Sequence, residues 1–222
     1  MCLRYALVES DIMEELGIED SRVSFVPSYN LALSASVPVV REVASARTLE
    51  LMEWGYYSPK DSQRIGNTRL DTVYEKPMFA DSFKLRRCIL PASCFYEWRK
   101  EGKERFPMKI TVRARKGFAL AGIWRESVNH GGVVKVCSIC TTEPNELITP
   151  IHNRMPVILT QDMITPWLEN RELTPAEYDA VKKPFAANQM VAEEVDKYVS
   201  NVKNQGPQCW DKPRGEKQGL LF

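Results

Sequence analysis

The fold of the chain is decided by three apolar segments within residues 106–141, which read FPMKITVRARKGFALAGIWRESVNHGGVVKVCSICT. Residues 106–113, 118–124 and 133–141 are rich in β-branched, aromatic and other apolar side chains, as is typical of β-strands. Lys116-Gly117 and the run from Asn129 to Gly132 separate these segments and predict turns. Because consecutive strands joined by short turns run antiparallel, the stretch predicts an antiparallel sheet.

The rest of the chain adds strands and short helices. Strands are predicted at residues 3–8, 38–43, 48–54, 88–91, 94–98 and 157–160, and a loop at residues 21–36. Helices are predicted at residues 11–16 and 162–169. Another begins at Thr174, with Pro175 at its first position and Glu177 completing a capping box with Thr174. We expect one α/β (α+β) domain over residues 1–203, with a mainly antiparallel, barrel-like β core and short peripheral helices. Residues 204–222 are polar and rich in glycine and proline, which predicts a flexible tail.

Composition is that of an ordinary globular protein. The 222 residues are 44% apolar and 27% charged, with a formal net charge of +1. No apolar run reaches the ~20 residues that span a bilayer, and the early acidic residues from Glu9 onward argue against a secretory signal. We therefore expect no membrane contact, and we take a monomer as the default. Since there is no global basic field, any nucleic acid must meet basic groups gathered on one face.

Six cysteines are present, and two of them form the motif Cys137-Ser138-Ile139-Cys140. This spacing can indicate a zinc or redox site. Here it falls inside the predicted strand 133–141, where residues three apart point to opposite faces and cannot chelate one ion without a turn. We expect no metal site and no cofactor, and interpret these cysteines as small buried apolar residues.

Cys2 directly follows Met1. Once Met1 is removed, Cys2 carries an α-amine and a thiol on adjacent carbons. Such an aminothiol captures an aldehyde, because the amine condenses to a Schiff base and the thiol then closes a five-membered thiazolidine. The ordinary pKa values of the two groups, about 7.7–8.0 and about 8.5, leave a reactive fraction of each near neutral pH. The alternative is that Cys2 is an accident of the second codon.

Three further segments contain candidate catalytic side chains, each with a structural alternative. Glu97 lies between two aromatic residues in an apolar strand, where a raised pKa suits acid–base chemistry, unless strand alternation points it to solvent. His152, in a loop braced by two prolines, is a candidate proton shuttle or a structural histidine. Asn67 and Arg69 can orient an aldehyde or hydroxyl and bind a phosphate, or serve ordinary turn chemistry.

In their order and spacing, these segments resemble the SRAP family, the SOS response-associated peptidases. The resemblance covers residues 2 to about 167. It rests on Met1-Cys2-x-Arg4-Tyr5, Trp54-Gly55, Asn67-Thr68-Arg69 and the runs RRCILPA (86–92), FYEW (95–98), TTEPNEL (141–147) and IHNRMPVIL (151–159).

The resemblance implies a protein that binds single-stranded DNA containing an abasic site, including at single-strand/double-strand junctions. Cys2 would form a thiazolidine crosslink with the sugar aldehyde after the protein removes its own Met1. Glu97 would assist ring opening, His152 would transfer protons in imine formation and reversal, and Asn67 would orient Cys2 and the sugar. A cytoplasmic location is implied, associated with the nucleoid in a bacterium.

The same resemblance implies the DNA contacts. Arg4, Arg69 and Arg154 are candidates for phosphate binding. Trp54 and Trp98 are candidates for packing against flanking bases, because base stacking tolerates any sequence. Trp54 also fits a position in the core.

The sequence departs from the family pattern in four places. Leu3 replaces the usual Gly after Cys2, and its side chain could narrow the approach to the thiol. Asn67-Thr68-Arg69-Leu70-Asp71 stands for the family's Asn-Ala-Arg-Ser-Glu, and Ser93-Cys94 for its Asp-Gly. Ala80 takes the place of a common basic residue, which removes one expected phosphate contact.

The last five residues, Gln218-Gly219-Leu220-Leu221-Phe222, resemble the short peptide by which bacterial proteins dock on the replication sliding clamp. Gln218, Leu221 and Phe222 would make the contacts. A flexible tether would raise the local concentration of the domain at replication forks.

Two other functions stay open. One is a non-covalent module that binds single-stranded DNA. The other is a cysteine peptidase with Cys2 as an N-terminal nucleophile, assisted by His152 and Asn67.

Overall fold

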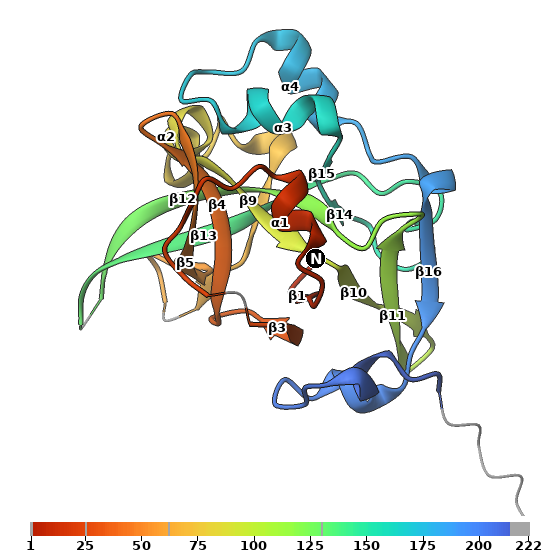
Figure 1. The fold of residues 1–222 in the computed structure, drawn as a ribbon. Helices are drawn as coiled ribbons and strands as arrows, with labels where there is room; N and C mark the ends of the chain where they lie inside the picture. Colours follow the sequence, from red (N-terminus) through yellow and green to blue (C-terminus); the bar gives the residue numbers. More distant parts are fainter. Residues whose placement is uncertain (1, 25, 62, 130, 214–222) are drawn as a thin grey trace, which may run out of the picture.

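A computed structural model describes residues 2–24, 26–61, 63–129 and 131–213 (Figure 1). The interpretations of Met1 and of residues 218–222 lie outside these described residues. The strands are β1 (Arg4–Leu7), β2 (Asp20–Ser21), β3 (Ser28–Ala32), β4 (Ser36–Val43), β5 (Ala46–Trp54), β6 (Tyr56–Tyr57), β7 (Arg64–Ile65), β8 (Asn67–Arg69), β9 (Arg87–Ala92), β10 (Cys94–Glu101), β11 (Glu104–Val112), β12 (Phe118–Asn129), β13 (Gly132–Thr142), β14 (Met155–Pro156), β15 (Ile158–Leu159) and β16 (Met190–Glu194). The α-helices are α1 (Asp11–Glu15), α2 (Pro77–Leu85), α3 (Gln161–Leu168) and α4 (Pro175–Lys182), and the 3₁₀ turns are η1 (Leu70–Thr72), η2 (Ala187–Gln189), η3 (Lys197–Ser200) and η4 (Pro207–Trp210).

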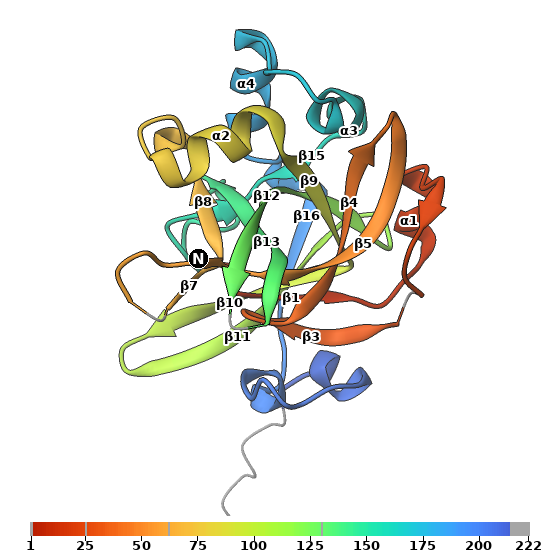
Figure 2. The same ribbon diagram turned by 90° about the vertical axis from the view of Figure 1, so that its left-hand side faces the viewer.

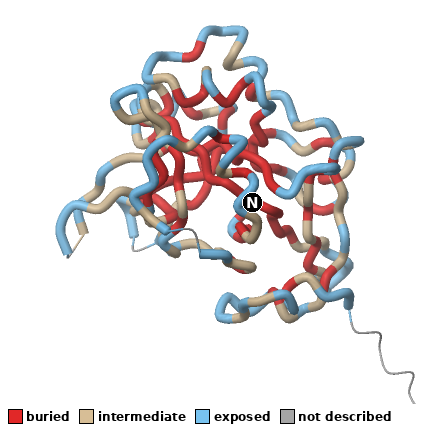
Figure 3. The backbone as a smooth tube through the Cα atoms, in the orientation of Figure 1, coloured by how far each residue is buried: buried red, intermediate tan, exposed pale blue. Residues whose placement is uncertain are grey.

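Five strands close into a barrel. β13, β12, β9, β4 and β5 follow one another as antiparallel neighbours, and β13 also pairs in parallel with β5 through Cys137 and Trp54. Closure leaves no open edge in this ring of strands. Its apolar side chains form the main core, which runs through the centre of the molecule (Figure 3). The predicted strands 118–124 and 133–141 become β12 and β13.

A second sheet, in the order β16-β11-β10-β1-β3, packs beside the barrel with all neighbours antiparallel. The chain passes from the barrel into this sheet at Ser93, between β9 and β10. The N–H of Ser93 donates to the carbonyl of Ala6 at 2.7 Å, and its hydroxyl accepts from the N–H of Val8 at 3.0 Å. Ser93 thereby fixes the bend that brings β10 next to β1.

Alternation along the second sheet gives its two faces different partners. Tyr5 and Phe95, which are cross-strand neighbours, belong to the barrel core. Ala6, Cys94 and Tyr96 belong to a separate apolar cluster on the other face. β3 lies inside the stretch predicted as a loop; that prediction is wrong, because residues 28–32 pair with β1.

The predicted fold class is confirmed: a single, mostly β domain with short peripheral helices. α2, α3 and α4 lie together on one side of the barrel, as both views show (Figures 1 and 2). α4 begins at the predicted capping box, where Thr174 Oγ accepts from the N–H of Glu177 at 3.3 Å. Within the described part of the chain, no helix is long and apolar enough to cross a membrane.

The packed domain extends beyond residue 203, so the predicted start of the tail at residue 204 lies too early. Gln205 accepts through Oε1 from the N–H of Tyr29 at 3.1 Å. Cys209 is buried in η4, and Trp210 Nε1 donates to the hydroxyl of Tyr96 at 2.8 Å. These long-range contacts place η3 and η4 against the outer face of the second sheet.

Candidate active site

Cys2 lies in the main core, two residues before the start of β1. Its side chain is fully buried, and Sγ donates to the carbonyl oxygen of Arg4 at 3.6 Å. Burial raises the pKa of the thiol, and the charge of nearby Glu97 raises it further. The neutral thiol therefore predominates at neutral pH, and its reaction requires a group that accepts its proton.

Asn67 fixes the backbone of Cys2. β8 pairs in parallel with β13, with Asn67 opposite Ile139, and this pairing carries Asn67 to the N-terminal segment. Asn67 Nδ2 donates to the carbonyl oxygens of Cys2 and Gly66, both at 2.9 Å. Its Oδ1 is buried and has no hydrogen-bond partner among the described residues. The side chain thus holds Cys2 and offers an acceptor.

Glu97 lies on β10, two residues beyond Phe95 and therefore on the face that meets the barrel. Only 4% of the residue is exposed, so alternation points it inward and not to solvent. Burial raises the pKa of its carboxyl group. A larger share of neutral carboxyl groups is thus available at a given pH than for an exposed glutamate.

His152 ends the second of two successive backbone turns, which begin at Asn145 and Ile148. Its Nδ1 accepts from the N–H of Arg154 at 3.0 Å and lies 3.3 Å from the carbonyl oxygen of the same residue. Nδ1 can therefore accept or donate a hydrogen bond without moving, depending on the tautomer of the ring. Burial lowers the pKa of the imidazole, so the ring is mostly neutral at pH 7.

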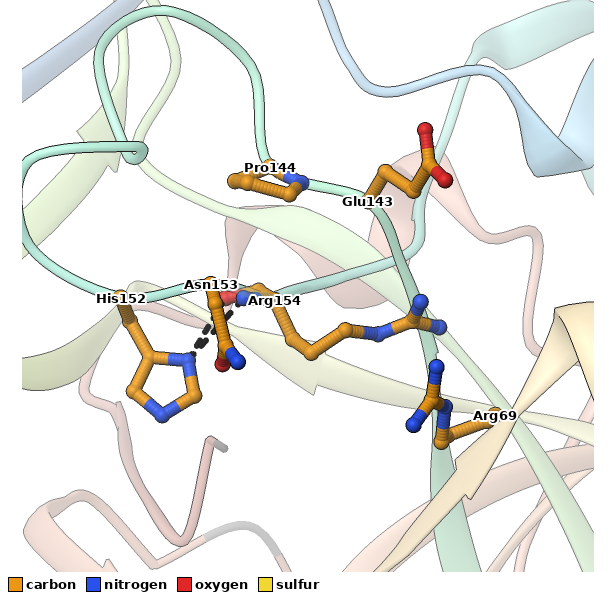
Figure 4. A pocket seen from close by; sticks show the side chains of 6 residues that line it. All are labelled: Arg69, Glu143, Pro144, His152, Asn153 and Arg154. Carbon is orange, nitrogen blue, oxygen red and sulfur yellow. Dashed lines mark hydrogen bonds between the residues drawn. The ribbon is translucent and has the colours of Figure 1, made fainter.

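Two surface cavities meet at His152. One, of about 610 Å³, is also lined by Arg69, Asn153 and Arg154 (Figure 4). The other, of about 530 Å³, is also lined by Glu97. His152 thus forms a wall of both cavities, and a ligand that spans them passes the imidazole.

Arg69 and Arg154 are brought together by Asp71. Arg69 Nη2 donates to Asp71 Oδ2 at 2.8 Å, and Arg154 Nη2 donates to Asp71 Oδ1 at 2.7 Å. Figure 4 shows the two guanidinium groups side by side at one end of the cavity. Arg154 is mostly buried and also donates to the carbonyl of Thr141, whereas Arg69 is exposed. The sequence analysis assigned no role to Asp71. The feature that could have indicated one is the position of this carboxylate at the end of the Asn67–Asp71 motif.

Arg4 and Trp98 lie on the other face of the second sheet. The Arg4 guanidinium donates to Asn30 Oδ1 at 2.6 Å and to the carbonyls of Val199 and Ser200 at 3.0 and 3.1 Å. It also lies 5.6 Å from the centre of the Trp98 ring. Both residues line the second cavity. Arg4 is thus engaged in holding η3, and its contact with a phosphate stays a prediction.

Trp98 keeps a partly exposed ring at this cavity, where Nε1 donates to Ser200 Oγ at 3.1 Å. Its stacking on a base stays a prediction. Sequence reasoning missed Ser200, because its contact with Trp98 joins residues 102 positions apart.

Trp54 does not occupy a DNA-facing position. The residue is fully buried, its Nε1 donates to the carbonyl of Gly66 at 2.9 Å, and its ring packs edge-on against Tyr5 at 5.3 Å. The prediction that Trp54 stacks on a base is contradicted by this burial, because a base could reach the ring only if the core opened.

Leu3, the departure next to Cys2, is partly exposed and lines the second cavity. A Cβ on Gly66 would lie 2.9 Å from Leu3 Cδ2 and 2.6 Å from Leu33 Cδ1. Leu3 and Leu33 therefore fill the space that a side chain at position 66 would take. The larger residue at position 3 is accommodated by glycine at position 66.

The six cysteines are all free and buried. Cys137 and Cys140 lie on β13 inside the core, as expected for small apolar residues. In the described ranges, no group of three or more histidine, cysteine or acidic side chains is arranged to hold a metal ion.

Together, the fold and the site define a β-barrel protein with a buried cysteine at position 2, a buried acid and a histidine that lines two cavities. The model of the SOS response associated peptidase (SRAP) family matches residues 1–202, and the chain belongs to that family.

Similar proteins agree with this assignment. The chain is 35% identical over 220 residues to the abasic site processing protein YoqW of Bacillus subtilis, covering 94% of this chain and 98% of that protein. It is 26% identical over 205 residues to the abasic site processing protein YedK of Escherichia coli, covering 90% of each. A crystal structure of a protein from Bacteroides thetaiotaomicron matches with a TM-score of 0.83 at 25% identity, covering 96% of this chain and all of that one.

Proposed function

We propose that this protein recognises an abasic site in single-stranded DNA and forms a covalent thiazolidine crosslink through Cys2, which shields the lesion during replication. One observation carries the proposal: Asn67 fixes the carbonyl of buried Cys2, and buried Glu97 lies on β10, the strand paired with β1. A thiol, a carboxyl group of raised pKa and an imidazole suit aldehyde chemistry. The relatives' names, which state abasic site processing, support this substrate.

The reaction begins when the protein removes Met1 and frees the α-amine of Cys2. Glu97, whose raised pKa increases the neutral fraction of its carboxyl group, donates a proton to the ring oxygen of the sugar while the anomeric hydroxyl releases its proton to water, and the ring opens to an aldehyde. The amine attacks the aldehyde carbon, and loss of water gives a Schiff base. Cys2 Sγ then bonds to the same carbon while the thiol proton passes to the nitrogen. The thiazolidine closes with one water released and without oxidation or reduction.

His152 and Asn67 assist these proton transfers. Because His152 Nδ1 lies near both an N–H and a carbonyl of Arg154, Nε2 can release or take up a proton as the carbinolamine loses water. The same exchange serves the slow reversal of the crosslink. Asn67 Oδ1, which no described residue engages, accepts a hydrogen bond from the amine or from a sugar hydroxyl.

The DNA follows the two cavities that meet at His152. Arg69 and Arg154 bind phosphates in the first cavity, and Trp98 packs against a flanking base in the second. Arg4 supports Trp98 and adds positive charge beneath it. Single-strand/double-strand junctions are accepted as substrates, and a cytoplasmic monomer suffices for the reaction.

Experiments on wild type and Cys2→Ala separate the crosslinking function from the two alternative functions. The crosslinking function predicts that the variant binds abasic DNA but forms no adduct. A non-covalent binding module predicts no adduct from wild type either, and a cysteine peptidase predicts turnover of an unrelated peptide. Cys140→Ala, which also removes a buried thiol, is the matched control and retains the adduct. Wild type that binds abasic DNA without forming an adduct, although Met1 is absent, would contradict the proposal.

We further propose that residues 218–222 dock on the replication sliding clamp through Gln218, Leu221 and Phe222. The sequence pattern of the tail supports this interaction. The test is recovery of purified clamp by the whole chain and by a chain that ends at Lys217. Loss of recovery with the shorter chain is expected, and equal recovery would end the idea.

A further inference from the structure

Two cations line the second cavity on the hairpin formed by β10 and β11, which projects from the second sheet (Figure 2). Lys100 on β10 lies directly opposite Arg105 on β11. Lys100 is two residues beyond Trp98 and therefore on the same face of the strand. β10 pairs with β1 at Phe95 but runs on to Glu101, so this part of the hairpin extends past β1.

The opposed pair is unfavourable within the protein alone, because like charges directly across two antiparallel strands repel each other. Among the described residues, no carboxylate forms an ion pair with Lys100 or Arg105, and both side chains are exposed. The other cations of the two hairpin strands and of η3 are paired, whereas Lys103, in the turn of the hairpin, also forms no ion pair among the described residues but lines neither of the two cavities. These pairs are Arg99 with Glu101 and Glu194, Lys109 with Glu193, and Lys197 with Glu104.

The positions of the cations relative to His152 indicate their role. Arg69 and Arg154 line one of the cavities that share His152, and Lys100 and Arg105 line the other. A polyanion that crosses both cavities would meet positive charge on each side of the imidazole. An extended nucleic acid strand has this form, since each of its nucleotides carries one phosphate charge.

We propose that Lys100 and Arg105 bind the DNA backbone on the side of the lesion opposite to Arg69 and Arg154. This inference rests on the proposed function and deepens it, because it requires nucleotides on both sides of the abasic site. The bound phosphates relieve the repulsion between the two cations. Binding is electrostatic, so the pair contributes to affinity and salt dependence but not to sequence preference.

The first experiment measures the affinity of Lys100→Ala/Arg105→Ala for a single-stranded oligonucleotide that carries a tetrahydrofuran abasic analogue. The analogue has no aldehyde, so only non-covalent binding is observed. We expect affinity about tenfold below wild type at low salt, and a slope of log K against log salt that is shallower by about 1.4 for two lost phosphate contacts.

The matched control is Arg22→Ala/Lys116→Ala, which removes two exposed cations that pair with Asp20 and Asp11 away from both cavities. We expect its slope to equal that of wild type. The thermal midpoint of the Lys100/Arg105 variant should not fall, because the substitution removes a repulsion. A wild-type slope for this variant, or an equal change in the control, would overturn the inference.

A second experiment tests the side of the lesion. Two oligonucleotides carry the analogue near the 5′ end or near the 3′ end, so that each extends to one side only. We expect the Lys100/Arg105 variant to match wild type on one of them and to bind more weakly on the other. An equal loss on both would indicate a general effect of charge and would contradict the assignment.

Failure of the proposed function is distinguishable from failure of this inference. If wild type forms no adduct with an aldehyde-bearing oligonucleotide while the salt slopes differ as expected, the crosslinking proposal fails and the phosphate site stands. If the adduct forms and the slopes do not differ, the phosphate site fails alone.

Discussion

The side-chain amide of Asn67 donates a hydrogen bond of 2.9 Å to the backbone carbonyl oxygen of Cys2. The two residues are 65 positions apart and meet because β8 pairs with the central strand β13. The barrel, and not the N-terminal segment itself, therefore sets the position of the proposed nucleophile. A second bond from the same amide group to Gly66 fixes the orientation of Asn67.

Asn67→Ala should slow adduct formation about 10- to 100-fold, because the reacting groups of Cys2 lose their alignment. Affinity for the tetrahydrofuran analogue should change far less. Single-turnover rates at saturating DNA measure the first effect, and fluorescence anisotropy measures the second. Asn67→Asp is the control for the donor, since it keeps the size but removes the N–H; a wild-type rate for Asn67→Asp would contradict the role given to this bond.

Glu97→Gln should lower the rate of adduct formation about 10²- to 10⁴-fold, because the proton donor for ring opening is lost. The same substitution should raise the thermal midpoint. Burial raises the folded-state pKa of Glu97, so below its unfolded pKa the carboxyl is neutral in both states and carries no penalty. As the pH rises through the folded pKa, the folded wild type loses stability.

The stability difference between Glu97→Gln and wild type should therefore grow from pH 4 to pH 8. Thermal unfolding at several pH values measures it. A wild type that gains stability over Glu97→Gln as the pH rises would show that the carboxylate is stabilised in the fold and not penalised by burial.

Protonation of the Cys2 α-amine should slow adduct formation below its ordinary pKa of about 7.7–8.0 in every variant. His152 should add a second acid limb with a midpoint below 6.5, because burial lowers the pKa of its imidazole. His152→Ala should lose only this second limb and react about 100-fold more slowly at pH 7. Rates measured from pH 5 to 8 test both effects, and a second limb retained in the variant would exclude His152 as the titrating group.

Trp54→Phe should reduce stability by about 1 kcal/mol, through loss of the hydrogen bond to Gly66, and should leave DNA affinity unchanged. Trp98→Ala should instead weaken binding by about 1–3 kcal/mol, the contribution of stacking on one base. Denaturant unfolding and binding to the abasic analogue separate the two residues. Weaker DNA binding by Trp54→Phe would reverse the assignment made from its burial.

Much of the fold was accessible from local sequence patterns. The apolar runs and turn residues of 118–141 predict β12 and β13, and the capping box at Thr174 predicts the start of α4. These elements are predictable because their signals come from residues adjacent in the sequence. The strand β3 was missed because its pairing with β1 depends on residues more than twenty positions away.

The site was accessible mainly through its motifs. Strand alternation alone left the direction of Glu97 open, and the structure settles it because Phe95 on the same face belongs to the barrel core. The burial of Trp54 follows from the parallel contact of β5 with β13, which no local pattern records. The packing of Trp210 on Tyr96 likewise joins residues 114 positions apart, so the tail was predicted to begin too early.

Intact-mass analysis tests the central claim most directly. Wild type, Cys2→Ser and Cys140→Ala are each incubated with a single-stranded oligonucleotide that carries one abasic site, without a reducing agent. We predict that wild type and Cys140→Ala lose Met1 and gain the mass of one oligonucleotide less one water. Cys2→Ser keeps an amine but no thiol, and should give a stable adduct only after borohydride reduction of its Schiff base. A stable adduct of Cys2→Ser without reduction, or wild type that lacks Met1 and forms none, would contradict the thiazolidine mechanism.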